Sequence, residues 1–453
     1  MEYLLPLYVN AADESPLLAS TAATAMECFS QTPGRTMLMC EARKMYVSAV
    51  ALTQKAISDP VEVKSDLTLM AVMLLGLFES FMASEDTFES WGHHANGAVA
   101  IVKLRGKEML NNPVSAKLFW DVRTQMVIGQ VARCKPVEDI FYEFDGWKYL
   151  PEDDCFGVAN RLTIVTMQVP AMREVAMRIL RGPMDWAIAR EIVTLMEDAQ
   201  RVDRELAAWS LDVPDLWRFK TLGLCKRMDD PITAQVYPGS IHGYQDIWTA
   251  RHWNIYRSYR ILCQAIILNC LERLIPATKI ASTDEYRRTA TISQNMVDDI
   301  CASVPFHLGF PALIYDMKDD TSSNNSRDHS RDDNDLPRAK LFQPARFKDA
   351  QATGGYNLFR ELFVAANVVV IPEAQRTWIM NRIRYIGAKY GLTQATVLAS
   401  QGLQRLQGAR SASFVDFAPL RDGWWEQTGG VHWRRFLDHE DGWVVDMWQG
   451  PQG

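Results

Sequence analysis

The sequence lacks an excess of basic residues. It has 48 lysines and arginines against 55 aspartates and glutamates, which gives a formal net charge of −7 at pH 7. Proteins that coat nucleic acid usually carry a basic balance or a basic stripe, because contacts with phosphates dominate their affinity. The sequence has neither. We therefore expect no direct nucleic-acid binding by this chain.

Long apolar runs are also missing. The longest run in a helical segment extends from Ile261 to Leu271 and is interrupted by Gln264 and Asn269. It is far shorter than the roughly 20 residues that a helix needs to cross a bilayer. The amino terminus has no positively charged region before its apolar residues, unlike a secretory signal. The sequence thus predicts a soluble protein of the nucleus or cytoplasm, with no membrane partner.

Cysteines are few and widely spaced. The eight cysteines stand singly in apolar context, at positions 28, 40, 134, 155, 225, 263, 270 and 301. No C-x-x-C pair is present, so neither a zinc knuckle nor a dithiol redox motif is expected. Thiols in a reducing compartment commonly pack as small hydrophobic groups, and we expect the same here.

The common catalytic signatures are absent as well. There is no H-E-x-x-H, G-x-S-x-G or phosphate-binding glycine loop. A terpene-cyclase type D-D-x-x-[DE] motif is not formed either, because Asp298-Asp299 is followed by Ile300, Cys301 and Ala302. We therefore expect no metal and no cofactor, and no catalytic residue can be assigned.

The sequence is instead rich in helical periodicity. In the segment 65–83, apolar residues recur every three or four positions, from Leu67 to Met82. The segment 89–105 places Ala95, Ala98 and Val102 on one face and ends at Gly106, a favourable helix stop. Its small residues, including Gly97, predict close antiparallel packing on the preceding helix.

No alternating pattern typical of strands stands out, so the expected fold is an all-α, multi-helix body. Further helices are expected at 22–28, 41–57, 115–133, 170–180, 183–209, 247–274, 283–301, 355–370, 373–390 and 394–408.

Composition divides the chain into four parts. Residues 1–318 form the expected helical body. Residues 319–340 are nearly devoid of apolar side chains, which predicts a disordered acidic loop. Helices of 341–420 are expected to pack on the body. The tail 421–453 is rich in tryptophan, which favours packing onto the body or onto a partner.

Several segments, in order, resemble the regulatory body of fungal Zn2Cys6-type transcription factors. The first is a "DP" turn, Asp59-Pro60, followed by a helix with Leu75 and Glu79. The next are a W-x-x-H-x-x-G-A segment (Trp91, His94, Gly97, Ala98), a W-x-x-Y-R-x-x-R-I segment (Trp253, Tyr256, Arg257, Arg260, Ile261) and an I-C-x-S-V-P segment (residues 300–305). A last segment, Trp378 to Ala395, is similar to the closing helices of that family, so the resemblance covers about 40–420. It implies the helical fold of that family.

The zinc cluster of that family is missing from the sequence. Such a cluster binds two metal ions through six closely spaced thiolates, whereas Cys28 and Cys40 are the only cysteines of the first 130 residues. A basic recognition helix and a heptad coiled coil are absent too. The resemblance therefore implies a regulator-like protein without its own DNA-binding domain. An upstream exon lost from the gene sequence is a further alternative.

Two histidine-containing segments were considered as sites. His93 and His94 are adjacent on a helix and point about 100° apart, so His94 is expected to be a core histidine hydrogen-bonded to a neighbour. The densest aromatic and titratable segment supplies the ligand-pocket candidates: His242, Tyr244, Trp248, His252, Trp253 and Tyr256. Aromatic surfaces can bury an apolar ligand while His252 or Tyr244 supplies an orienting hydrogen bond. The alternative is that this segment is simply a core helix.

Two functions remain open from the sequence. The first is a transcription-regulator-like protein, possibly of a secondary-metabolite cluster, whose partners are proteins or an apolar small molecule. The second is a cofactor-independent enzyme of fungal secondary metabolism, such as a cyclase, isomerase or pericyclase, on the same fold. Such reactions need only a pre-organised conformer and one or two hydrogen bonds, which suits the missing motifs.

Overall fold

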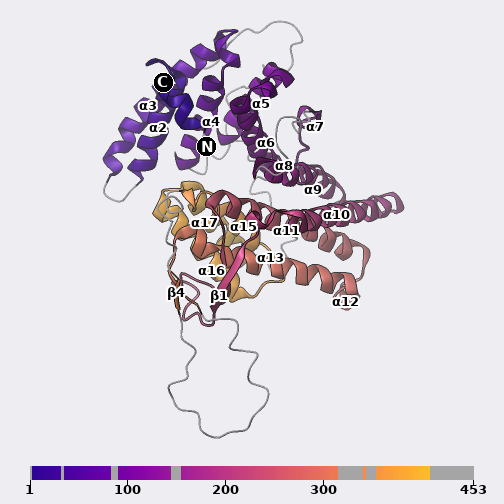
Figure 1. The fold of residues 1–453 in the computed structure, drawn as a ribbon. Coiled ribbons are helices and arrows are strands. Elements are labelled where there is room, and N and C mark those ends of the chain that lie inside the picture. The colour runs from indigo at the N-terminus through magenta and orange to yellow at the C-terminus, as the bar shows by residue number, and fades with distance from the viewer. Residues whose placement is uncertain are drawn as a thin grey trace.

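The computed structural model describes residues 3–31, 35–82, 90–143, 155–314, 340–342 and 353–408, and it is dominated by helices (Figure 1). The all-α prediction is confirmed. The described part of the expected 319–340 loop is Lys340 alone, and the tail 421–453 lies outside the described residues. No helix among the described residues combines the length and apolarity that crossing a membrane requires.

The amino-terminal helices occupy the upper part of Figure 1. Their bounds are α1 (Leu4–Val9), α2 (Pro16–Ser30), α3 (Met39–Ser58), α4 (Asp66–Met82), α5 (Ser90–Arg105), α6 (Pro113–Arg133), α7 (Ile140–Glu143), α8 (Cys155–Thr166) and α9 (Val169–Ile179), with short 3-10 helices η1 (Thr36–Leu38), η2 (Glu62–Lys64) and η4 (Gly106–Asn111).

The remaining elements form the lower part of Figure 1. They are α10 (Trp186–Asp212), η6 (Asp215–Trp217), β1 (Lys220–Cys225), β2 (Gly239–Gly243), α11 (Ile247–Leu274), α12 (Ala277–Ile280), α13 (Asp284–Leu308), β3 (Ala312–Ile314), β4 (Lys340–Phe342), α15 (Phe359–Ala366), α16 (Glu373–Tyr390) and α17 (Thr393–Gly408).

Helices α4 and α5 are the expected antiparallel pair. Arg105 at the end of α5 donates to Asp66 at the start of α4 over 2.7 Å. At the other end, Nε2 of His94 lies 3.0 Å from Oε1 of Glu79. Between these two contacts, a Cβ added to Gly97 would lie 3.7 Å from Cγ1 of Val72, so the helices are in close contact. The hydrogen bond predicted for His94 is therefore confirmed, on a half-buried side chain.

Helix α11 is the central core helix. Nearly every side chain from Thr249 to Leu271 is buried, so the helix is covered on all sides by α10, α13, α9 and α15. Its start is fixed by Asp246, whose side chain accepts a hydrogen bond from the backbone N–H of Thr249. The apolar run that begins at Ile261 is thus the buried second half of this helix.

The expectation of no strands was wrong. Among the described residues, β1 pairs with β2 and β3 pairs with β4, both antiparallel. The β1–β2 ladder contains Gly223, Gly239 and Gly243 and is irregular between Thr221 and Gly223. Because these glycines and the irregularity interrupt the alternation of side chains, the period-2 signal is too weak to read from the sequence. The hairpin is held in place by packing of β2 on α13.

Several helices differ from the sequence prediction, among them α1, α7 and α12, which were not expected, and α2, which begins at Pro16. Helix α8 was not expected, and α13 continues to Leu308 although it was expected to end at Cys301. Pro305 lies inside α13, where it removes one backbone donor. The buried residues from Ala302 to Leu308 show why the helix persists, because their burial outweighs the lost hydrogen bond.

The cysteines only partly follow the expected packing. Cys134, Cys263, Cys270 and Cys301 are buried free thiols, as predicted. The two cysteines of α2 and α3, at positions 28 and 40, are exposed, so the prediction was wrong for them. They lie on faces of α2 and α3 that the core does not cover.

The last helices contact the first ones. Helix α17 packs on α4, and the hydroxyl of Thr393 donates to the backbone carbonyl of Phe81 over 3.1 Å. Between α16 and α17 the chain turns at Gly391, whose φ is 63°. A Cβ at Gly391 would lie 2.0 Å from Cβ of Gln31 at the end of α2. This turn therefore needs glycine for both its backbone conformation and its close contact.

We predict that Gly391→Ala destabilises the protein more than Gly106→Ala. Both glycines have a φ of 63°, but a Cβ at Gly106 would meet nothing within 4 Å. In the control, Gly106→Ala, the free energy of unfolding should therefore fall only by the cost of a Cβ in a left-handed conformation, about 1–2 kcal/mol. Gly391→Ala should lose roughly 1–3 kcal/mol more, because α2 must shift. Urea unfolding measures both, and equal losses would contradict the contact with Gln31.

Candidate functional site

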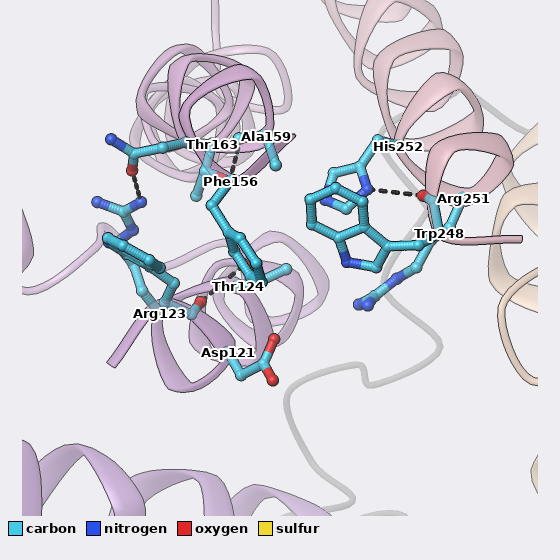
Figure 2. A pocket seen from close by; sticks show the side chains of 11 residues that line it. Asp121, Arg123, Thr124, Phe156, Ala159, Thr163, Trp248, Arg251 and His252 are labelled. Atoms are coloured by element: carbon cyan, nitrogen blue, oxygen red, sulfur yellow. Dashed lines mark hydrogen bonds between the residues drawn. The ribbon is translucent and has the colours of Figure 1, made fainter. Parts of the chain in front are cut away.

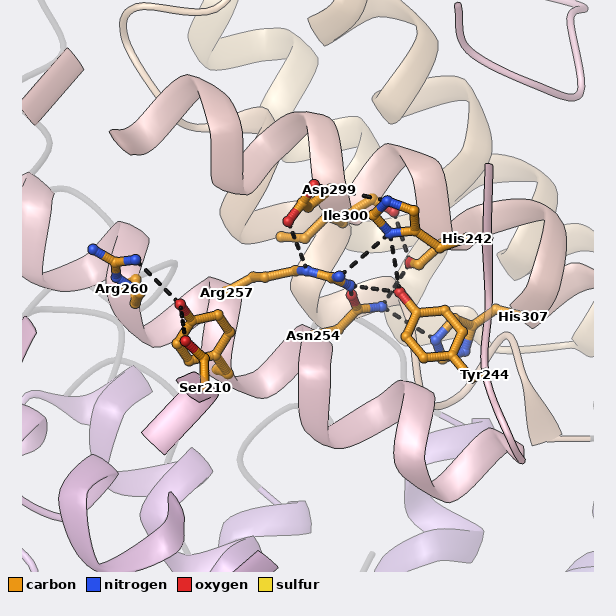
Figure 3. Close-up of polar contacts among 11 residues, drawn as sticks. Ser210, His242, Tyr244, Asn254, Arg257, Arg260, Asp299, Ile300 and His307 are labelled. Carbon is orange, nitrogen blue, oxygen red and sulfur yellow. Dashed lines mark hydrogen bonds and ion pairs between the residues drawn. The ribbon is translucent and has the colours of Figure 1, made fainter. Parts of the chain in front are cut away.

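The most polar part of the core is centred on Arg257, at the middle of α11. Its side chain is fully buried, and its guanidinium donates over 2.7 Å to the hydroxyl of Tyr244 and over 2.8 Å to Oδ1 of Asn254. Its Nε lies 3.5 Å from Oδ2 of Asp299, whose side chain is 33% exposed. Figure 3 shows the guanidinium of Arg257 extending from α11 toward Tyr244, which follows β2, and toward Asp299 on α13. A buried cation is stable only when it is paired in this way.

Asn254 extends the network toward α13. Its side-chain amide donates over 2.8 Å to the hydroxyl of Ser303 and lies 3.1 Å from Nε2 of His307. The carbonyl of the same amide already accepts from Arg257. One asparagine thereby fixes the register of α11 against α13.

His242 of β2 completes the network in its neutral form. Its Nδ1 lies 3.4 Å from both the Tyr244 hydroxyl and Nη2 of Arg257, so this nitrogen accepts hydrogen bonds. The proton is then on Nε2, which faces Asp299 at 3.9 Å. Burial, together with the charge of Arg257, lowers the pKa of His242 to about 3. Burial raises the pKa of Asp299, although Arg257 opposes this effect.

Aromatic rings surround the same cation. The guanidinium carbon of Arg257 lies 5.0 Å from the Phe219 ring, 5.7 Å from Trp253 and 5.8 Å from Tyr244. Ring faces attract a cation, and the attraction strengthens where water is excluded. Three rings thus surround a buried cation that also donates to Tyr244 and Asn254, which is typical of a structural centre.

The sequence candidates divide between three places, which are the surroundings of Arg257, a contact with α10 and a separate cavity. His242, Tyr244 and Trp253 surround Arg257, whereas Tyr256 donates to the hydroxyl of Ser210 on α10. Trp253 donates its indole N–H to the backbone carbonyl of Trp217 over 2.7 Å. These contacts use the polar atoms of the side chains within the protein itself.

Trp248 and His252 line a separate cavity between α6, α8 and α11 (Figure 2). Its volume is about 30 Å³, enough for about one water molecule. The other lining residues are Trp120, Asp121, Arg123, Thr124, Phe156, Ala159, Asn160, Thr163 and Arg251. Nδ1 of His252 donates to the backbone carbonyl of Trp248 over 2.8 Å, and burial lowers the pKa of His252 to about 3.

Sequence reasoning did not find the α6 and α8 side of this cavity. Phe156, Trp120 and Asp121 lie about a hundred residues before Trp248, on elements with no recognisable motif. The signal that the sequence offered was the density of aromatic residues around Trp248, and it marks only one wall of the cavity.

Metal chemistry finds no support in the residues that the structure describes. Within them, no group of three or more His, Cys, Asp or Glu side chains is arranged to hold a metal ion. The Arg257 network offers a buried cation and neutral imidazoles, which can fix elements in register and bind polar groups.

Comparison with known proteins gives one distant similarity. The chain is 20% identical over 388 residues to a protein named transcription factor dbaG from Emericella nidulans, which covers 85% of this chain and 82% of that protein. No protein-family model matches the chain, and no solved structure matches it. The chain is thus similar, at low identity and over most of its length, to a fungal transcription factor.

We predict that Arg257→Met destabilises the protein by roughly 3–5 kcal/mol, because it leaves Asp299 and the polar atoms around it without their partner. Arg178→Met is the matched control. Arg178 forms a surface ion pair with Glu191, with 59% and 43% of the two side chains exposed, so its loss should cost under about 1 kcal/mol. Urea unfolding of the two variants compares them, and similar midpoints would show that Arg257 is not a structural centre.

We also predict that stability falls as the pH is lowered from 7.5 to 5.5. Burial lowers the pKa of His242, His252 and His307 to about 3 each, below the value of about 6.5 in an unfolded chain. Between these values the unfolded state binds more protons, so each histidine should cost about 1.4 kcal/mol at pH 5.5. His252→Gln should remove one third of this histidine effect. Equal pH slopes for the variant and the wild type would contradict a neutral, buried His252.

Proposed function

We propose that this chain is a transcription-regulator-like protein that acts through protein contacts or small-molecule sensing, without contacting DNA directly. The observation that carries the proposal is the similarity to transcription factor dbaG, which extends over 85% of this chain. Similarity spread over most of both chains favours a shared body over a single shared motif.

The contacts of the regulator-like segments support this proposal. Arg260 pairs with Asp203 through two hydrogen bonds of 2.7 and 2.9 Å, and Ser303 accepts from Asn254. Glu79 and His94 join α4 to α5. Residues that carry the resemblance therefore hold helices together, which is the role expected of a structural scaffold and differs from that of reacting groups.

Charge supports the absence of direct DNA contact. The net charge of −7 disfavours approach to phosphates. In the described part of the chain, no group of three or more His, Cys, Asp or Glu side chains is arranged to hold a metal ion. We propose that the protein reaches its target genes, in the nucleus and in connection with a secondary-metabolite cluster, through another protein.

Regulation can be tested by deleting the gene in its fungal host. We expect loss of the transcripts of the affected cluster together with all of its products. Reintroducing the wild-type gene or the Arg178→Met variant should restore both, whereas Arg257→Met should not. Transcript sequencing and metabolite profiling of the same cultures provide the measurement.

Direct DNA binding is tested separately with the purified full chain. Mobility-shift assays on the promoters of the affected genes should show no specific retention, and co-purification from nuclear extract should recover a DNA-binding partner. Normal transcripts with one accumulated intermediate would instead indicate the enzyme alternative and would overturn the proposal.

A further inference from the structure

The cavity between α6, α8 and α11 has a continuous aromatic wall. The ring of Phe156 lies 5.8 Å from that of Trp120 and 5.3 Å from that of Trp248, and Trp248 lies 4.3 Å from the ring of His252. The wall joins three helices from distant parts of the sequence (Figure 2). Flat aromatic surfaces of this kind favour a flat aromatic molecule.

Two residues that line the cavity, Trp120 and Arg251, have side-chain polar groups that form no hydrogen bond with the described residues. The indole N–H of Trp120 is buried and has no hydrogen-bond partner among the described residues. Arg251 forms no ion pair or hydrogen bond within the described part of the chain, although it lines the cavity together with Asp121. Buried polar groups are normally satisfied, so an unpaired donor indicates a missing partner.

Tyr3, near the amino terminus, borders this site through its contact with the lining residue Asp121. It is 6% exposed, and its hydroxyl donates a hydrogen bond to Asp121. Burial, together with the charge of Asp121, raises the pKa of Tyr3, while Arg251 acts in the opposite direction. The phenol of Tyr3 therefore donates a hydrogen bond to the carboxylate of Asp121 and lies within the electrostatic influence of Arg251.

The element that holds Tyr3 in place is weakly attached. Helix α1 has six residues, none of them fully buried, and no side-chain cap at its start. Leu5 and Val9 are 69% and 71% exposed. Helices this short have little stability of their own, so Tyr3 can be displaced at low cost.

We propose that this cavity is a binding site for a small phenolic acid, which replaces Tyr3. The ligand hydroxyl donates to Asp121, its acidic group pairs with Arg251, and its ring lies along the wall of Phe156 and Trp248. Displacement of α1 then converts binding into a change at the surface. This inference rests on the proposed function, because it names the class of molecule that the regulator senses.

Calorimetric titration of the purified full chain with 4-hydroxybenzoate tests the site. Tyr3→Ala should tighten binding at least tenfold relative to wild type, because the protein no longer has to displace the ring. Tyr3→Phe keeps the ring but loses the hydrogen bond, and should tighten binding about threefold or more. The matched control is Tyr8→Ala, on the same helix at a 40% exposed position, which should leave binding unchanged.

Two further probes test the polar groups. Benzoate lacks the hydroxyl and 4-hydroxybenzyl alcohol lacks the charge, so each should bind Tyr3→Ala at least tenfold more weakly than 4-hydroxybenzoate. In the Tyr3→Ala background, Arg251→Gln should abolish the preference for 4-hydroxybenzoate over 4-hydroxybenzyl alcohol. In the same background, Asp121→Asn should reduce the preference for 4-hydroxybenzoate over benzoate. Circular dichroism confirms that each variant is folded.

The inference is overturned if Tyr3→Ala, or Tyr3→Phe should the alanine variant not fold, binds no better than Tyr8→Ala. It is also overturned if the three probes bind alike. Because binding is measured on purified protein, failure here leaves the transcript result standing, and failure of the transcript test leaves the binding result standing.

Discussion

A positive charge enclosed in an apolar core constrains everything placed around it. Removing a guanidinium from water costs several kcal/mol, which only close partners can offset. At Arg257 those partners come from three elements, since Asp299 lies on α13, Asn254 on α11 and Tyr244 directly after β2. The three elements can therefore meet in one register only. The short hairpin, which would not be stable alone, is held in place by this requirement.

Most of the long helices could be predicted because their apolar residues recur at helical spacing. The pattern of α4 and α5 even indicated their close contact, which Gly97 permits. The β1–β2 hairpin could not be predicted, since its stability comes from contacts with α13 and not from its own sequence. The end of α13 could not be predicted for a similar reason, because tertiary burial of residues 302–308 overrides the local helix-breaking tendency of Pro305.

The candidate site was only half predictable. Aromatic density indicated Trp248 and His252, which do line the cavity. The contact between Tyr3 and Asp121 joins residues 118 positions apart, and no local pattern encodes such a contact. The resemblance identified residues such as Arg257 and Ser303, while their physical role became visible only from the hydrogen bonds they share with Asn254.

The contact of α17 with α4 has a consequence for synthesis in the cell. The hydrogen bond from Thr393 to Phe81 spans 312 residues, so the ribosome needs roughly 16–60 s between making its two ends. During that time the surface of α4 that α17 later covers stays open to the cytosol. The newly made amino-terminal half is therefore a natural client for chaperones, which shield apolar surface until the last helices emerge.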